Sequence, residues 1–436
     1  MPPPAACMSQ CDPSPGAANT CPQGYHCAPD GFCDAVCTPT GNECGDGYVC
    51  TPDGRCKGED ECTGLECQVV NCAAQGKPDT TLKGTVYAPN GTLPLYGIQV
   101  YVPNEALPPF TEGAECGRCA DLPGAPIVQT TTDEAGNFTL PGVPAGSDIP
   151  LVITSGKWRR QIKISTVAEC TDTQVAAADS RLPKNRTEGD IPRIALSTGN
   201  ADSLECLLRR MGIADEEIGT AGDDRRVHLY DSKDSPGRGV PKFDANFPGG
   251  SGNFADSKTF WNDVNKLKAY DMVILSCEGG QYSSANKPQD ALNAMKDYAD
   301  LGGRVFLSHW HNIWISGNYK ASPGSIANPN PVIQDWKDIA TWTNGQNFSQ
   351  KTDVIDETSN PKGPSFATWM VNVMGSTVRG QIPVKDARIT STGINTAKAE
   401  LWTYELDSHA PQNFQFTTPV NAPADQRCGK VVYSDM

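Results

Sequence analysis

Residues 270–314 read YDMVILSCEGGQYSSANKPQDALNAMKDYADLGGRVFLSHWHNIW, and this stretch decides the fold class. Met272–Leu275 and Arg304–Leu307 are short apolar runs, typical of strands that are buried on both faces. Between them, apolar residues recur at helical spacing behind Pro288, which suits a first helical turn, and Gly302-Gly303 ends the helix. The stretch therefore predicts a strand, a crossover helix and a second strand, and so a parallel sheet with right-handed connections.

In such sheets, functional residues gather beyond the carboxyl ends of the strands. Here those ends carry Ser276–Gly280 and Ser308–His311, followed by a loop rich in aromatic residues. Trp310, Trp314 and Tyr282 would suit stacking on a sugar ring. The residues expected to line a ligand-binding site are Ser197, Glu278, Tyr282, Ser308, His309, Trp310, His311, Trp314 and Asp435.

Two kinds of chemistry are open at these strand ends. Cys277 could act as a nucleophile, with Glu278 and His309 as catalytic partners, although an unpaired reactive thiol is exposed to oxidation outside the cell. His309 and His311 could instead bind a divalent metal with Glu278, and His228 or Asp435 could complete the set. Both histidines share a face only if the strand continues through residue 311. The alternative is that these side chains pack the end of the domain, and no cofactor is expected on that interpretation.

The bulk properties exclude several classes of protein. The chain has 436 residues and a net charge of −15, which argues against nucleic acid or an anionic membrane as the main partner. No apolar run approaches the roughly 18 residues of a membrane span, and the start MPPPAAC lacks the basic and apolar segments of a signal peptide. Of 18 cysteines, 12 lie in the first 72 residues, so we expect a secreted or cell-surface protein from an oxidising compartment. Its export signal, and with it a lipid anchor, would have been removed.

Residues 1–79 form the Cys-rich region and contain an internal repeat. CPQGYHCAPDGFC and CGDGYVCTPDGRC follow one another at a period of 23 residues, and each gains a further cysteine upstream. Four cysteines allow three pairings, of which first-with-third and second-with-fourth is our expectation; a zinc site is disfavoured because the usual short Cys-x2-4-Cys spacing is absent. The cysteines expected to form disulfides are Cys11, Cys21, Cys27, Cys33, Cys37, Cys44, Cys50 and Cys56.

Residues 80–165 change to short alternating strands separated by turns such as Asp133–Gly136. The segments Gly-Thr-Val before Asn-Gly, Ile-Gln-Val-Tyr and Thr-Asp-Glu-Ala-Gly-Asn-Phe-Thr-Leu resemble the carboxypeptidase regulatory-like domain. That resemblance implies an all-β, prealbumin-like sandwich that is non-catalytic and serves as a spacer or interaction domain. Its CGRC insertion, Cys116 to Cys119, is expected to be a structural bridge. Residues 166–190 are polar and irregular and are interpreted as a linker.

Residues 191–436 show the order of a C-terminal α/β domain, with an insertion or lid expected at about 331–427. Tyr-Asp-x-Val-Ile-Leu, a helix and Gly-Gly-Arg-Val-Phe-Leu-Ser-His resemble the class I glutamine amidotransferase-like superfamily, in particular its trehalose-utilisation-like branch. The resemblance implies a flavodoxin- or amidotransferase-like parallel sheet. Amidotransferases carry a cysteine on a Gly-x-Cys-x-Gly elbow, whereas the matching strand here ends at Ser308-His309-Trp310, so catalysis of that kind is not expected. The ending CGKVVYSDM reads as a strand without a following helix, so the natural chain is expected to continue.

The whole order of Cys-rich repeats, sandwich and α/β domain also resembles exported proteins of myxobacteria. We therefore expect a multidomain, non-catalytic protein that recognises a glycan or an extracellular protein, or that assembles with itself. An odd cysteine count on each side of the linker predicts one bridge between the modules or two free thiols. The main alternative function is an extracellular hydrolase with a metal or a nucleophile at the strand ends.

Overall fold

The computed structural model describes residues 62–116, 122–232, 239–250, 252–282, 287–317 and 332–436, together with four short strands before residue 62. The chain divides into two compact units. The first comprises residues 1–87, 95–109 and 117–182, and the second comprises residues 88–94, 110–116 and 183–436. The expected linker at 166–190 therefore does not behave as one, since its first seventeen residues belong to the first unit.

The repeated cysteine-containing segments form equivalent hairpins. Strands β1 (Tyr25–Cys27) and β2 (Cys33–Ala35) pair in the first repeat, and β3 (Tyr48–Cys50) and β4 (Cys56–Gly58) pair in the second. The pairing expected for the eight repeat cysteines lies outside the described residues. After the repeats in the sequence, Cys62 forms a disulfide with Cys67, and Cys72 forms a disulfide with Cys170.

Two small sheets share one apolar core in the rest of the first unit. One sheet has the order β10-β9-β6-β7 and the other has the order β11-β5-β8. Their strands are β5 (Thr81–Thr85), β6 (Gln99–Pro103), β7 (Pro126–Thr131), β8 (Asn137–Pro141), β9 (Gly146–Ser155), β10 (Trp158–Val167) and β11 (Asp172–Gln174). Alternating residues such as Phe138 and Leu140 are buried between the sheets, as the period of two predicts. Val175 and Leu182 extend this core, which is why the expected linker packs with the sandwich.

The second unit is built on an eleven-stranded sheet whose first half is parallel. The strands run in the order β13-β14-β12-β16-β17-β22, with β15 paired to β14. They are β12 (Ile194–Ser197), β13 (Ile218–Thr220), β14 (Val227–Asp231), β15 (Ala255–Asp256), β16 (Met272–Leu275), β17 (Arg304–Ser308) and β22 (Gly429–Ser434). The predicted strand–helix–strand unit is confirmed: β16 and β17 pair in parallel, and the helix between them spans Gln289–Asp300.

Helices cover this sheet because their apolar faces match its buried strands. They are α1 (Leu204–Met211), α2 (Lys258–Trp261), α3 (Val264–Leu267), α5 (Gln289–Asp300), α6 (Ile313–Ser316) and α7 (Gly363–Asn372). Leu292, Met295 and Tyr298 of α5 are fully buried, as the helical spacing predicts. They join a core that also contains Trp261 and Trp314.

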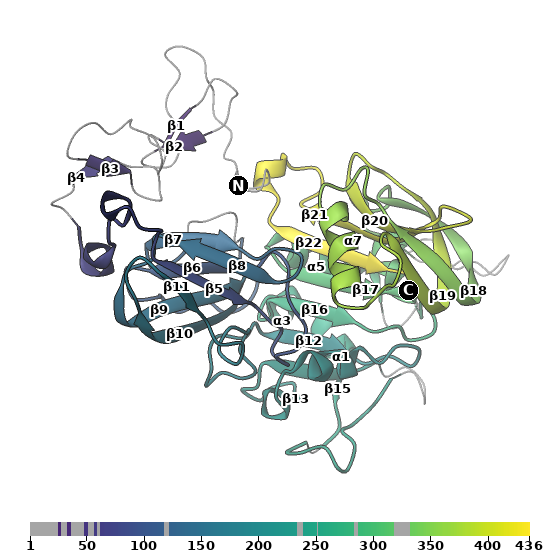
Figure 1. Ribbon diagram of the computed structural model, residues 1–436. Helices are drawn as coiled ribbons and strands as arrows, with labels where there is room; N and C mark the ends of the chain where they lie inside the picture. Colours follow the sequence, from purple (N-terminus) through teal and green to yellow (C-terminus); the bar gives the residue numbers. More distant parts are fainter. Residues whose placement is uncertain are drawn as a thin grey trace. The chain divides into compact units, whose positions relative to one another are not determined.

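The second half of the sheet is antiparallel and is formed by the segment that was expected to be an insertion or lid, at about 331–427. Strands β18 (Ala340–Ile355), β19 (Gln381–Ile394), β20 (Ala399–Glu405) and β21 (Pro411–Thr418) continue the sheet from β22 in the order β22-β21-β20-β18-β19. The residues expected to be an insertion or lid lie between β17 and β22 in sequence and extend the main sheet, because β21 pairs with β22 from Asn413 to Thr418. Figure 1 shows these strands in green and yellow beside β17 and β22.

The cysteines of the second unit are partly bonded. Cys116 forms a disulfide with Cys428, just before β22, rather than with Cys119 of the same CGRC motif. Cys206 and Cys277 are free thiols, the first exposed and the second buried. Cys119 lies outside the described residues.

Candidate functional site

Strand order places the best position for a site between β12 and β16. In chain order the five strands β14-β12-β16-β17-β22 follow the 2-1-3-4-5 arrangement of flavodoxin-like sheets. The order in which strands are added across the sheet changes direction between the first strand, β12, and the third, β16, and ligands bind outside the carboxyl ends of the strands at that point. The residues that follow β12 and β16 are therefore the leading candidates for a ligand site.

Three side chains of different chemistry meet there. Asp202 follows β12, Cys277 follows β16, and His309 follows β17. A carboxylate oxygen, the thiol sulfur and an imidazole nitrogen of these residues all lie within 4.8 Å of one another. Cys277 and His309 were predicted at the strand ends, whereas Asp202 was not among the expected site residues.

Asp202 is held by two donors on one oxygen. The backbone N–H of Cys277 donates to Asp202 Oδ2 at 3.1 Å, and the Ser308 hydroxyl donates to the same oxygen. The other oxygen, Oδ1, lies 3.5 Å from His309 Nδ1. The carboxylate therefore links the ends of three neighbouring strands instead of capping α1.

His309 occupies an unusual backbone position. Its φ angle is +43°, in the left-handed region that non-glycine residues rarely adopt. The strand ends at Ser308, and residues 309–312 form a 3-10 turn, so His309 and His311 do not share a strand face. The Tyr433 hydroxyl donates to the His309 carbonyl at 3.0 Å and holds this turn. The Nε2 atom of His309 is buried and has no hydrogen-bond partner.

Cys277 is protected and not activated as a nucleophile. Its side chain is only 1% exposed, and this burial raises the pKa of the thiol to about 12, against the opposing effect of N–H groups of Trp310 and Gly279. The sulfur accepts from Gly279 N at 3.4 Å. Since the thiolate is the reactive form, a buried neutral thiol disfavours the nucleophilic alternative. A thiol, an imidazole and a carboxylate together remain suited to binding a metal ion.

Glu278, the next residue, faces a different cluster. Lys287 Nζ lies 2.8 Å from Glu278 Oε2, and both side chains are almost completely buried. Trp314 Nε1 donates to His311 Nδ1 at 3.1 Å, so His311 Nε2 carries the proton that it donates to the Ser276 carbonyl at 2.8 Å. Burial lowers the pKa of His311 to about 4, which keeps its ring neutral. The metal set expected from His309, His311 and Glu278 thus falls into two separately bonded clusters.

Other predicted ligand-binding residues are engaged within the protein. Ser197 Oγ lies 2.7 Å from Ser232 Oγ, and Asp435 accepts from Thr390 of β19 and from Tyr433. The guanidinium of Arg388 stacks 4.0 Å from the ring centre of Trp310. Both serines and Asp435 are buried, so these groups build the end of the domain.

The aromatic residues are placed differently from what sugar stacking requires. Trp314 is fully buried, with the edge of Trp261 at 5.5 Å between ring centres, and Trp310 is 5% exposed. Tyr282 is half-buried and has a positive φ angle of 45°. The two tryptophans therefore present no open face to a ligand.

His228 lies near the amino end of the interior strand β14. It is the second residue of β14, whereas the cluster lies beyond the carboxyl ends of the strands. Its Nδ1 is 2.8 Å from the Tyr270 hydroxyl, and burial lowers the pKa of its imidazole. His228 therefore cannot complete a metal site with His309.

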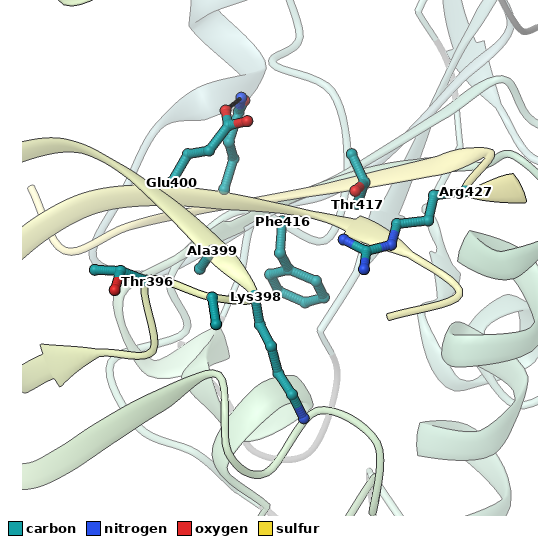
Figure 2. Close-up of a pocket in the computed structure, with 9 residues that line it drawn as sticks. Thr396, Lys398, Ala399, Glu400, Phe416, Thr417 and Arg427 are labelled. Carbon is teal, nitrogen blue, oxygen red and sulfur yellow. Dashed lines mark hydrogen bonds between the residues drawn. The ribbon is translucent and has the colours of Figure 1, made fainter. Parts of the chain in front are cut away.

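A pocket of about 170 Å³ lies on the antiparallel half of the sheet. Figure 2 shows Lys398, Glu400, Phe416 and Arg427 among the residues that line it. Arg427 Nε donates to the Ala422 carbonyl at 2.9 Å, and Gln415 Nε2 donates to Glu400 Oε2 at 2.5 Å. None of the residues expected to line a ligand-binding site lines this pocket.

Comparisons with known proteins do not identify a family for this chain. No protein-family model and no curated protein matches the chain. A solved ThuA-like protein from Bacteroides uniformis has 9% identity and a TM-score of 0.31, over 56% of this chain and 80% of the other. A cytoplasmic protein from Salmonella typhimurium has 10% identity and a TM-score of 0.27, over 56% and 87%. A chain of a type II cohesin–X-dockerin complex from Acetivibrio cellulolyticus has 17% identity and a TM-score of 0.17, over 30% and 86%.

At these TM-scores the neighbours carry no argument about the fold or the function of this chain. Within the described residues, no helix is long and apolar enough to cross a membrane.

Proposed function

We propose that this chain is an exported, non-catalytic binding protein whose α/β domain recognises another extracellular protein. The observation that carries the proposal is the burial of the strand-end side chains. Of the nine residues expected to line an open site, eight are buried, and only Tyr282 is half-buried. Side chains in that state can shape a domain, but they cannot contact a substrate in solution.

Export is supported by the disulfides. Cys72–Cys170 and Cys116–Cys428 join segments 98 and 312 residues apart. Bridges of this kind persist in oxidising compartments and are rare in the cytosol. The first unit, which resembles the carboxypeptidase regulatory-like domain, would serve as a spacer.

A protein partner is favoured over a glycan by the surface chemistry. The tryptophans expected to stack on sugars are buried, whereas Val371, Met374 and Val378 are exposed within eight residues at the end of α7. Met374 is 90% exposed, which is unusual for a large apolar side chain. We call these three residues the α7 patch, and apolar side chains of this kind are typical of the centres of protein interfaces.

The test compares two forms of the protein as bait on envelope extracts of the source organism. Met374→Glu with Val378→Glu is expected to abolish specific capture, because it places two charges in the apolar contact. A matched control, Leu301→Glu with Leu406→Glu, charges two exposed apolar residues elsewhere and should leave capture unchanged.

Two further measurements distinguish the alternatives. Binding of wild type to a glycan array that survives in the α7-patch variant would replace the protein partner with a glycan. Hydrolysis of ester or glycoside substrates that is lost in Cys277→Ser would show an enzyme, and the proposal would then be wrong.

A further inference from the structure

We propose that Asp202, Cys277 and His309 form a binding site for one zinc-class divalent transition metal ion. The three residues follow three adjacent parallel strands, and their ligand atoms lie within 4.8 Å of one another. Tetrahedral zinc has bonds of about 2.0–2.3 Å to such ligands, which places the ligand atoms about 3–4 Å apart. Closing the cluster around an ion therefore needs shifts of about 1 Å.

The distances fit two ligands of one ion better than a hydrogen bond. His309 Nδ1 and Asp202 Oδ1 are 3.5 Å apart, beyond the usual range for a strong N–H···O bond. The Nε2 atom of the same ring is buried without a partner. An imidazole that is 8% exposed and leaves a nitrogen unpaired is costly unless some group binds it. A metal ion bound at Nε2 would supply that partner, whereas one bound at Nδ1 would be shared with Asp202 Oδ1.

The surroundings already hold the ligands in place. Two donors fix Asp202 Oδ2, from Cys277 N–H and the Ser308 hydroxyl, and leave Oδ1 on the side of His309. The Cys277 sulfur accepts from Gly279 N, a contact that also stabilises a metal-bound thiolate. Groups that orient the ligands from behind are typical of metal sites and contribute to their affinity.

Charge and ligand type select the metal. The Asp202 carboxylate and a Cys277 thiolate together offset the two positive charges of the ion, which lowers the cost of burying it. The thiol proton leaves to solvent as the sulfur–metal bond forms. Mg²⁺ and Ca²⁺ prefer sites made only of oxygen, whereas a thiolate with an imidazole suits Zn²⁺ or its spectroscopic substitute Co²⁺. Three protein ligands leave a fourth position for water.

This site goes beyond the proposed binding function and does not depend on it. The α7 patch shares no residue with the metal cluster, so loss of metal and loss of partner capture are separable outcomes. Chelator treatment without effect on partner capture would leave both proposals standing.

The experiment measures metal binding by the full-length, unreduced chain. The protein is stripped with a chelator, and Zn²⁺ affinity is then measured by competition with a chromophoric chelator, with Co²⁺ absorption as a second readout. We expect one tight site and a cobalt–thiolate charge-transfer band. Cys277→Ser should remove the band, His309→Gln should weaken Zn²⁺ binding roughly 100-fold or more, and Ser308→Ala should weaken it roughly 10- to 100-fold.

Matched controls use equivalent groups outside the site. Cys206→Ser removes the exposed free thiol, and His409→Gln removes an exposed imidazole, and both should keep the tight site and the band. Should His309→Gln fail to fold, the cobalt band of Cys277→Ser decides the question. Equal zinc affinity in wild type and Cys277→Ser, or a cobalt spectrum without the thiolate band, would overturn the proposal.

Discussion

The two halves of the eleven-stranded sheet bury charged groups in different ways. In the parallel half, Glu278 leaves the end of β16 and meets Lys287, with both charges inside the protein and 2.8 Å apart. In the antiparallel half, Asp353 of β18 lies directly opposite Glu405 of β20, so two carboxylates face each other across the strands. The parallel half pairs opposite charges beyond the strand ends, whereas the antiparallel half places two carboxyl groups opposite each other within its strands.

The partners of the two opposed carboxylates explain how the antiparallel half tolerates them. Glu405 accepts from the backbone N–H and the hydroxyl of Ser408 and lies 3.2 Å from Lys351 Nζ. These contacts lower the pKa of Glu405 to about 2, against the opposing effect of its burial. Asp353 has only the Thr403 hydroxyl at 3.3 Å, and its Oδ1 is buried without a partner. Its pKa is raised to about 7, mainly by burial. One carboxylate is thus charged and the other largely protonated in mild acid.

The largest expected effect comes from breaking the pair in the parallel half. Lys287→Met leaves the Glu278 carboxylate buried without its cation, so the free energy of unfolding should fall by about 3–5 kcal/mol. Urea unfolding of the purified chain measures the loss. Lys296→Met is the matched control, because its pair with Asp300 is partly exposed and should cost less than about 1 kcal/mol.

A second variant shows whether the stability lost in Lys287→Met comes from the uncompensated charge of Glu278 or from the lost packing of the Lys287 side chain. Glu278→Gln added to Lys287→Met removes the uncompensated charge and should recover most of the stability. Equal losses for Lys287→Met and Lys296→Met would contradict the view that the buried pair is essential to this half.

The parallel half was largely predictable from the sequence. Strands buried on both faces are continuous apolar runs, so Met272–Leu275 and Arg304–Leu307 were recognisable without knowledge of their neighbours. Glycine and proline marked the ends of the helix between them. The carboxyl ends of parallel strands meet at one edge, and this rule alone brought Cys277 and His309 together.

The antiparallel half and the rest of the cluster were not predictable in the same way. An insertion or lid was expected at about 331–427, but nothing local indicates that β21 pairs with β22 and so extends the main sheet. Asp202 was missed because an aspartate before a helix usually caps it, whereas here it accepts from Cys277 N–H. Asp202 follows β12, beside the point where the strand order changes direction. This position was the signal that could have identified it.

The second expected effect is a stability contribution from Asp353 that falls as pH rises. A carboxylate with a lowered pKa has the opposite pH dependence. The folded-state pKa of Asp353, about 7, lies above the ordinary value near 4. Between pH 4 and 7 the folded chain therefore keeps a proton that the unfolded chain has lost, so the contribution of Asp353 to stability falls as pH rises. Asp353→Asn is neutral throughout, and its stability relative to wild type should rise by about 2–4 kcal/mol from pH 4 to 7.

Thermal or urea unfolding at a series of pH values measures this difference. Asp356→Asn is the matched control, because hydrogen bonds from Ser359 and Thr358 outweigh desolvation and lower the pKa of Asp356. That variant should lose stability relative to wild type as pH rises through 4, since the stabilising form of Asp356 is charged. A relative stability of Asp353→Asn that does not change with pH would show that Asp353 is charged in the folded protein.

The smallest expected effect tests where the two halves meet. Arg388 of β19 stacks on Trp310, which follows β17, with 4.0 Å between the guanidinium carbon and the ring centre. A partly desolvated cation–π contact contributes about 0.5–2 kcal/mol, so the pair should couple the halves by about 1 kcal/mol. A double-mutant cycle of Arg388→Met and Trp310→Leu, measured by urea unfolding, isolates this coupling from the cost of each change.

Arg379, which pairs with Glu357 at a half-exposed position, provides the control cycle of Arg379→Met with Trp310→Leu and should show no coupling. A coupling near zero for Arg388 would mean that its contact with Trp310 does not stabilise the junction, which the β21–β22 ladder and the bonds between Thr390 and Asp435 would then hold.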